Sequence, residues 1–410
     1  MSAPAPTTAP ARRVPTVVRR LGWVSFFTDS SSEMIYPLLP ALLRSLGAAP
    51  VWLGAMEGVA EAVSALVKYK MGPVTDRAPR KKPYIVAGYT LATFARPLLA
   101  FAAAGWHVVF LRAIDRTGKG VRGVPRDALL AESVDEKALA TAFAFHRAMD
   151  NAGSVLGPIL AFVLMRALEL PGRVVILLAI VPGLASLATL IFGVHERAKE
   201  PPALEHEREP VPSAAAPGRL PRPVKVYLAV LALFTLGASA DSFLLLRAVE
   251  LGMDASLTPV LWLALSGAKA LSNVPGGRLA DRIGRRRTLA AGWLLYAVVY
   301  ATLPLVRSPL AFGALVVVYG AYYGLTEGPE RALLAELTPT EIRGRAFGVM
   351  HALTGVAVLP ANLVFGALYA AHVALAFGVS AGCAALAAVL LFLTGRQRDA
   401  ATPGAATAEL

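Results

Sequence analysis

Long apolar runs alternate with short polar or charged breaks along almost the whole chain. A membrane-spanning helix needs about 20 mostly apolar residues, and the chain offers about a dozen runs of that length. In the first half, the runs predict helices over residues 17–43, 51–74, 84–103, 106–131, 138–165 and 173–194. In the second half, they predict helices over residues 224–249, 257–276, 288–306, 310–334, 345–368 and 371–394. The pattern predicts an all-α membrane protein with about twelve transmembrane helices in two pseudo-symmetric six-helix bundles.

The apolar pattern also divides the chain into domains. The two predicted bundles cover residues 17–194 and 224–394. Between them, residues 195–223 mix alternating charges with prolines and cannot build a core, so we interpret them as a cytoplasmic linker. We interpret residues 1–16 and 395–410 as cytoplasmic tails. The first apolar run carries acidic residues and lacks a clear small-residue cleavage site, so we expect a retained span and no signal peptide.

The distribution of charge predicts the orientation of the chain in the membrane. Loops after even-numbered helices are charged, whereas loops after odd-numbered helices are mostly short and nearly uncharged. Lysine and arginine gather on the cytoplasmic side of a membrane. We therefore expect a multi-pass protein of a bacterial inner membrane with both termini in the cytoplasm.

Composition excludes several other classes of protein. A mean hydropathy of +0.57 with 56% hydrophobic residues is too apolar for an ordinary soluble domain. The net charge of +13 reflects basic clusters at helix ends, so we do not expect nucleic acid as a partner. The single cysteine, Cys383, excludes an internal disulfide and a thiolate metal cluster. Because no nucleophile–base spacing, phosphate loop or metal-ligand cluster is present, we expect neither an enzyme nor a cofactor.

A basic signature occurs twice, and it reveals an internal repeat. GPVTDRAPRKK begins at Gly72, and the similar GRLADRIGRRR begins at Gly277, 205 residues later (277 − 72). We expect each signature to form a turn after an even-numbered helix. PRDALLAE at Pro125 recurs as PERALLAE at Pro329, at an offset of 204 (329 − 125). Two parallel six-helix halves are the internal symmetry of a two-bundle transporter, with the substrate site between the halves near the midplane.

The signatures and the helix count resemble the major facilitator superfamily, whose loop motif is Gly-x-x-x-Asp-Arg-x-Gly-Arg-Arg. The second half matches it with Gly277, Asp281, Arg282, Gly284, Arg285 and Arg286. The first half has Gly72, Asp76, Arg77, Arg80 and Lys81, but Pro79 stands where the second glycine is expected. The resemblance implies that these residues gate the transporter by latching the cytoplasmic helix ends in the outward-facing state.

Two further motifs resemble that family. Arg116, Lys119 and Gly120 are similar to its Arg-x-x-Gln-Gly pattern in the fourth helix. In the fifth helix, the residues Gly153, Gly157 and Pro158 match Gly-x-x-x-Gly-Pro, which the family associates with proton-coupled exporters. Small residues at spacing four also simply allow helices to approach closely. The stretch SFFTDSSSEMIYPLLP is similar to a poorly characterised bacterial branch of the family, and this similarity does not identify a substrate.

Ionisable residues inside the predicted spans are candidates for function, because they are costly there unless paired or hydrated. Helical spacing places four polar residues of the second helix on one face, and the eighth helix repeats this stripe at offset 205. The stripes are Glu57, Glu61, Ser64 and Lys68, and Trp262, Ser266, Lys269 and Asn273. We expect both stripes to face a shared cavity. The candidates for proton coupling are Asp29, Glu33, Glu57, Glu61 and Arg116.

Some of these charges have a structural interpretation instead. Arg116 and Lys119 could pair with Asp29, Glu33 or Asp115, and Arg126 with Asp127 or Glu330. His146 and Asp150, one turn apart, could relay protons, although we favour packing for a histidine near a helix end. The seventh helix also carries Asp241, to which we assign no role.

The sequence predicts a proton-coupled secondary transporter that exports small cationic or amphipathic compounds by alternating access. Its partners would be the lipid bilayer, protons and a small-molecule substrate, and we expect a monomer. The candidate substrate-binding residues are Tyr36, Ser64, Arg112, Lys119, Trp262, Ser266, Lys269, Tyr319, Tyr323 and Glu327. Antiport would arise if protons and substrate compete for the same carboxylates. The alternative is a proton-coupled importer or exchanger of an organic anion bound by Arg112, Arg116, Lys119 and Lys269.

Overall fold

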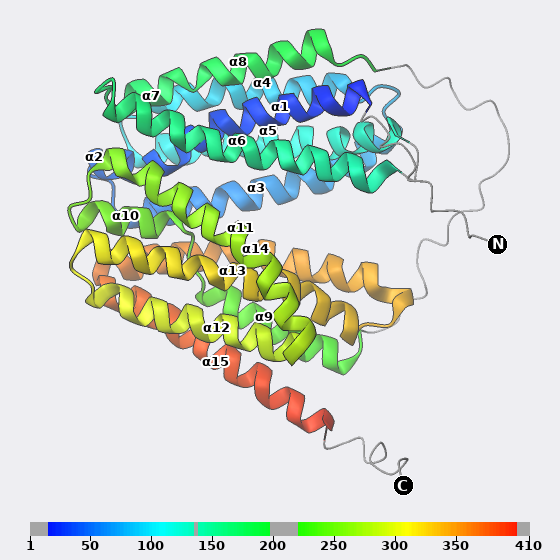
Figure 1. Cartoon of the computed structure of the whole chain (residues 1–410), viewed down its shortest axis with the longest axis vertical. Coiled ribbons are helices and arrows are strands. Elements are labelled where there is room, and N and C mark those ends of the chain that lie inside the picture. Colours follow the sequence, from blue (N-terminus) through cyan, green and yellow to red (C-terminus); the bar gives the residue numbers. More distant parts are fainter. Residues whose placement is uncertain (1–14, 135–137, 197–219, 400–410) are drawn as a thin grey trace, which may run out of the picture.

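The computed structural model describes residues 15–134, 138–196 and 220–399, and there the chain is helical apart from short turns (Figure 1). The first 14 residues, the bulk of the predicted linker (197–219) and the final residues (400–410) lie outside this description. The helices of the first half are α1 (Thr16–Ile35), α2 (Leu39–Ser45), α3 (Pro50–Arg77), α4 (Lys82–Leu98), α5 (Gly105–Glu132), α6 (Leu139–Arg166), α7 (Gly172–Leu178) and α8 (Ile180–Ala188). Those of the second half are α9 (Arg222–Gly237), α10 (Ser242–Glu250), α11 (Thr258–Ile283), α12 (Arg285–Thr302), α13 (Pro309–Leu337), α14 (Arg343–Ala371) and α15 (Val373–Asp399).

Short elements join some of these helices into single membrane crossings. The 3-10 turn η1 (Tyr36–Leu38) connects α1 to α2, and α7 continues into α8 and the π-helical turn η4 (Thr189–Gly193). In the second half, α9 and α10 form one crossing that is broken at residues 238–241. Each half therefore crosses six times, which confirms the predicted twelve-helix membrane fold.

Hydropathy separates these crossings into two groups. Nine helical segments of the described residues are long and apolar enough to span a membrane. The crossings formed by α1–α2, by α5 and by α11 fall outside this group. They carry buried or half-buried charges such as Asp29, Asp115 and Lys269. Charge inside a span is costly, so these three helices are where function is expected.

The Gly-x-x-x-Asp-Arg part of each signature is helical, which corrects the prediction of a turn. Gly72, Asp76 and Arg77 belong to the last turns of α3, and Asp281 and Arg282 belong to α11. Helix α11 ends at Gly284, whose φ of 94° lies in the left-handed region that glycine adopts readily. In the first half, the extended residue Ala78 and the proline after it end α3.

The two halves meet along α3 and α14 at the end of the molecule where α2 and α10 lie (Figure 1). A Cβ atom on Gly54 would collide with the backbone carbonyl of Asn362, and one on Gly58 would lie 2.7 Å from a methyl of Leu359. Only glycine allows this close approach. Farther along the same face of α3, the side chain of Tyr69 is 83% exposed. The halves therefore touch at the α2/α10 end and separate toward the opposite end, where α1 begins and α15 finishes.

A polar contact between the halves reinforces this closed end. Arg44 at the end of α2 donates a hydrogen bond of 2.6 Å to the backbone carbonyl of Val249 at the end of α10. The last carbonyls of a helix lack partners within the helix and carry a partial negative charge, so an arginine is well suited to this position.

Replacing Gly54 with valine should weaken the closed end, because the added atoms overlap the α14 backbone. Overpacking of this kind costs about 1–3 kcal/mol. We expect Gly54→Val to lower the thermal unfolding midpoint of the purified protein. Gly378→Val is the matched control, since a Cβ there meets nothing within 4 Å. Equal midpoints for the two variants would show that the α3–α14 contact is not close-packed.

Candidate substrate and proton site

A cavity of about 350 Å³ lies between the two halves. Its walls come from η1 and α3 in the first half and from α9, the 238–241 break, α13 and α14 in the second. The lining residues are Tyr36, Glu57, Glu61, Thr235, Ala238, Ser239, Ala240, Asp241, Tyr323, Val358, Ala361 and Asn362. The charged side chains in this lining are three carboxylates, so the cavity is acidic.

The break between α9 and α10 forms one wall of the cavity. Ala238 adopts extended geometry, which ends the helical hydrogen bonding. Side chains from other helices replace part of it, since the amide of Ala240 donates to Asn362 Oδ1 (2.8 Å) and the amide of Ser239 donates to the hydroxyl of Tyr296 (3.3 Å). Within a membrane, irregular backbone is tolerated where protein buries it or where it lines a polar cavity.

Two carboxylates of α3 face the cavity one turn apart. Glu57 is only 7% exposed, and its Oε1 has no hydrogen-bond partner among the described residues. Glu61 is exposed. A buried carboxylate oxygen that lacks a partner is unfavourable, and a cation or a proton would satisfy it.

Asp241 carries the third carboxylate, at the start of α10. Its Oδ2 lies 2.5 Å from Lys269 Nζ. The hydroxyl of Tyr319 donates to Oδ1 (3.0 Å), and that of Tyr323 donates to Oδ2 (2.9 Å). The Lys269 ammonium also lies 3.9 Å from the ring centre of Tyr323. The ion pair thus connects the start of α10 to α11, and the tyrosines of α13 hold its carboxylate.

Trp262 joins the acidic face of α1 to this cluster. Its Nε1 donates a 2.7 Å hydrogen bond to the carboxylate of Glu33, across the interface between the halves. Its ring centre lies 4.6 Å from that of Tyr36 and 5.1 Å from the Lys269 ammonium. A change in the charge of Glu33 would therefore act directly on a contact between the halves.

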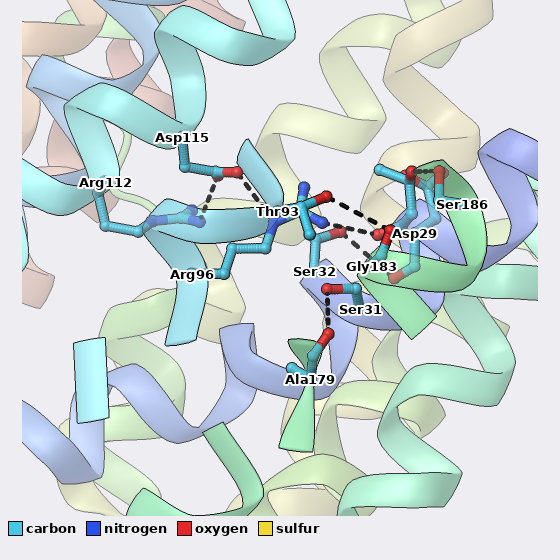
Figure 2. Close-up of polar contacts among 11 residues, drawn as sticks. Asp29, Ser31, Ser32, Thr93, Arg96, Arg112, Asp115, Ala179, Gly183 and Ser186 are labelled. Atoms are coloured by element: carbon cyan, nitrogen blue, oxygen red, sulfur yellow. Dashed lines mark hydrogen bonds and ion pairs between the residues drawn. The ribbon is translucent and has the colours of Figure 1, made fainter. Parts of the chain in front are cut away.

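Two of the basic residues of α5, Arg112 and Arg126, form ion pairs inside the first half. Asp115 lies between Arg96 (2.9 Å) and Arg112 (3.2 Å), and all three side chains are at most 4% exposed (Figure 2). Arg96 also donates to the backbone carbonyl of Thr28 on α1 (3.0 Å). Arg96 is not among the predicted site residues, although an arginine inside the third predicted span is itself a signal. Arg116 and Lys119 are the predicted candidates for pairing with Asp115, whereas Arg96 and Arg112 form the ion pairs.

Helix α1 is fixed between α6 and α8 by small and hydroxyl side chains. The positions of Gly153 and Gly157 lie against the backbone carbonyls of Phe26 and Ser30, so the exporter-like motif serves close packing here. On the other side, Ser31 donates to the carbonyl of Ala179 (2.8 Å), as Figure 2 shows. These contacts determine where Asp29 and Glu33 lie.

His146 belongs to a second polar cluster within the first half. It is 4% exposed, its Nε2 lies 2.9 Å from Ser25 Oγ, and its Nδ1 lies 3.6 Å from Asp150. Arg126 donates to the same serine (3.3 Å) and pairs with Asp127 (2.8 Å). The side chains of this cluster therefore contact one another, which supports a structural interpretation of its charges.

The signature residues lie at the open end of the molecule. Asp76, Arg77, Arg80, Asp281 and Arg282 are exposed.

Beside them, an ion pair occurs in both halves. Lys81 binds Glu132 at 2.8 Å, and Arg285 binds Glu336 at 3.1 Å. Both partners are related by the repeat offset of 204 (285 − 81 and 336 − 132). The glutamates end the PRDALLAE and PERALLAE repeats, so these repeats hold the signature helices.

The structure distributes the predicted substrate residues over three environments. Tyr36 and Tyr323 line the cavity, and Trp262, Lys269 and Tyr319 contact its lining residues. The others are absent from this lining: Ser64, Arg112, Lys119, Ser266 and Glu327. Among the proton-coupling candidates, Glu57 and Glu61 line the cavity, whereas Asp29, Glu33 and Arg116 do not. Asp241 is the lining residue that sequence reasoning noted without assigning a role.

A twelve-helix membrane protein with a polar cavity between two halves has the architecture of a transporter. A family model described as Major Facilitator Superfamily matches residues 21–269 and 246–409. The chain is 31% identical over 355 residues to an uncharacterized MFS-type transporter of Methanocaldococcus jannaschii, covering 85% of this chain and 87% of that one. The chain therefore belongs to the major facilitator superfamily.

Other relatives and solved structures agree with this family. The multidrug resistance protein MdtG of Enterobacter lignolyticus is 26% identical over 385 residues, covering 90% of this chain and 88% of that one. A crystal structure of the nucleoside transporter NupG superposes with a TM-score of 0.70 at 14% identity, covering 93% of this chain and 99% of that chain. Similarity at this level of identity shows the fold alone.

Removing the charge of Asp115 should destabilise the first half strongly, because two buried guanidinium groups would lose their counterion. Breaking a buried ion pair in this way costs about 3–5 kcal/mol. We expect Asp115→Asn to lower the unfolding midpoint in detergent far more than Asp127→Asn. The control removes the half-exposed carboxylate that pairs with Arg126, where about 0–1 kcal/mol is at stake. Similar midpoints would mean that the Arg96–Asp115–Arg112 group is not a stabilising network.

Proposed function

We propose that this transporter is a proton-coupled antiporter that exports small organic cations or amphipathic compounds by alternating access. The observation that carries the proposal is the acidic cavity between the halves, lined by Glu57, Glu61 and Asp241. A positively charged compound would find carboxylates in both halves. The drug-efflux names of relatives such as MdtG are in keeping with substrates of this kind.

The proton would compete with the substrate for the same carboxylates. One buried oxygen of Glu57 has no partner in the part of the chain that the structure describes, so Glu57 gains from either a proton or a cationic group. Mutually exclusive binding couples the two fluxes, since release of one ligand permits binding of the other. In this scheme the cavity carboxylates bind either the substrate or a proton. Arg116 on α5 is the proposed positive charge that pairs with them.

Glu33 would connect protonation to the movement of the halves. A charge-assisted hydrogen bond is roughly twice as strong as a neutral one, and Glu33 accepts such a bond from Trp262 of the other half. Protonation weakens this bond and favours a state in which the halves are arranged differently. Asp29, one turn earlier on α1, is the second candidate on this face.

The anion-importer alternative has less support. It needs free positive charge at the cavity, but Arg112 lies against Asp115 and Lys269 lies against Asp241. Lys119 is exposed and Arg116 is half-buried, and neither belongs to the cavity lining. The charged residues of the lining, Glu57, Glu61 and Asp241, are all carboxylates and therefore favour a cation over an anion.

The remaining proposals concern the placement of the chain. We propose that residues 1–16, 195–223 and 395–410 are cytoplasmic and that the bundles cover 17–194 and 224–394 of a monomer in the inner membrane. The open end of the molecule would then face the cytoplasm, in an inward-facing state. The exposed Asp–Arg signatures at that end would form their latch when the halves close there.

Flux measurements in proteoliposomes test the antiport proposal. With an acidic lumen, we expect ethidium or tetraphenylphosphonium to accumulate inside while protons leave. Glu33→Gln, Asp29→Asn and Glu57→Gln should reduce this flux at least about tenfold, equivalent to about 1.4 kcal/mol, because the coupling charge is lost. Glu327→Gln is the control, since Glu327 is exposed and absent from the cavity lining. Benzoate accumulation driven by an inward proton gradient and abolished by Arg116→Ala would establish the importer instead.

Reporter fusions test the proposed orientation. A green fluorescent protein fused after Leu410 should fluoresce, because that fold forms in the cytoplasm. Alkaline phosphatase fused after Glu169, in the turn between α6 and α7, should be active, because that turn would lie outside. The reverse pattern would place the open end of the molecule on the external side.

A further inference from the structure

The ammonium group of Lys269 occupies a site with the features of an alkylammonium receptor. Its Nζ lies 2.5 Å from a carboxylate oxygen of Asp241, 3.9 Å from the ring centre of Tyr323 and 5.1 Å from that of Trp262. Aromatic faces attract cations through their quadrupoles, and aromatic cages recognise ligand ammonium groups in this way. A carboxylate and two aromatic rings therefore surround one positive charge.

The receptor is held in place independently of the lysine. The Asp241 carboxylate also accepts hydrogen bonds from Tyr319 and Tyr323, at 3.0 Å to Oδ1 and 2.9 Å to Oδ2, respectively. The backbone before it is held by Asn362, which accepts the amide hydrogen of Ala240. If the lysine left, the carboxylate would keep its position and two of its hydrogen-bond donors.

The site opens onto the cavity. Asp241 and Tyr323 line the cavity wall, and the Lys269 side chain is 22% exposed. Glu57 faces the same cavity with an oxygen that has no partner among the described residues, although its side chain is more than nine-tenths buried. A ligand in the cavity thus meets one carboxylate with an oxygen that lacks a partner among the described residues, and a second carboxylate that the Lys269 ammonium neutralises.

We propose that Asp241, Tyr323 and Trp262 form the subsite for the ammonium group of the substrate, and that Lys269 is a tethered occupant which the substrate displaces. The proposal rests on the antiport function above and specifies its substrate class as alkylammonium compounds with an apolar body. Exchange of one ammonium for another keeps Asp241 neutralised, so the displacement avoids an uncompensated buried charge. The flexible lysine stem can carry its charge toward water, because Asn273, one turn along the same face, is exposed.

Equilibrium binding to the full-length protein tests the subsite. The probe is n-butylammonium, which reproduces the lysine side chain beyond its Cα, and butan-1-ol is its neutral counterpart. A tethered competitor acts at an effective concentration of about millimolar or more. We therefore expect Lys269→Met to lower the Kd of n-butylammonium at least tenfold by calorimetry at fixed pH. Lys269→Arg keeps the tethered charge and should bind as weakly as the wild type.

Two more variants make the result specific. Adding Asp241→Asn to Lys269→Met should abolish the gain, while butan-1-ol should bind equally weakly to every variant. Lys269→Gln, which keeps a donor toward Asp241, should show the same gain if the methionine variant does not fold. Unchanged or weaker n-butylammonium binding in the variants without the lysine charge would overturn the proposal, as would a gain that survives Asp241→Asn.

Binding separates this proposal from the transport function. Proton-coupled cation flux in the wild type without tighter binding in Lys269→Met would leave antiport standing and remove the subsite. Tighter binding without any proton-coupled flux would leave an ammonium subsite in a protein that is not an antiporter.

Discussion

The cost of placing ionised side chains in an apolar medium governs how this protein is arranged. A charge at the centre of a span costs several kcal/mol unless it is paired or hydrated. The first half meets part of this cost with Asp115, which forms ion pairs with Arg96 on one helix and Arg112 on another. The second half surrounds the Lys269–Asp241 pair with tyrosine hydroxyls. Glu57 lies where the two halves meet, and one of its carboxylate oxygens has no partner among the residues that the structure describes.

The same constraint acts on the backbone. Unpaired amides are as unfavourable in lipid as unpaired charges, so a broken helix needs substitutes for its lost hydrogen bonds. The 238–241 break obtains them from Asn362 and Tyr296, which belong to two other helices of the same half. The break in turn positions Asp241 on the cavity wall. Packing of the second half, rather than any local signal, therefore determines where this carboxylate lies.

This dependence on packing explains what the sequence could predict. The helices follow from run length and hydropathy, and the cavity carboxylates Glu57 and Glu61 follow from helical spacing. The two ion pairs of Asp115 did not follow from the sequence. Arg112 lies one turn away on α5, about as near in sequence as Arg116 and Lys119. Arg96 reaches Asp115 only through the packing of α4 on α5. The helical part of the signature was missed because its polar residues resemble a loop. The φ of Gly284 ends α11, whereas the extended Ala78 ends α3.

The repeat supplies equivalent positions to the two halves, but the chemistry at these positions differs. Glu57 on α3 corresponds to Trp262 on α11, and Ser64 corresponds to Lys269, at offset 205 (262 − 57 and 269 − 64). Helix α3 therefore lines the cavity with carboxylates, whereas α11 contacts the lining residues through an aromatic ring and an ammonium group. Because Trp262 contacts Glu33, Tyr36 and Lys269 together, a change of charge on either side of the interface acts on one side chain. In the proposed function, the ligand site and the contact between the halves would thus share side chains, and this sharing would couple binding to a movement of the halves.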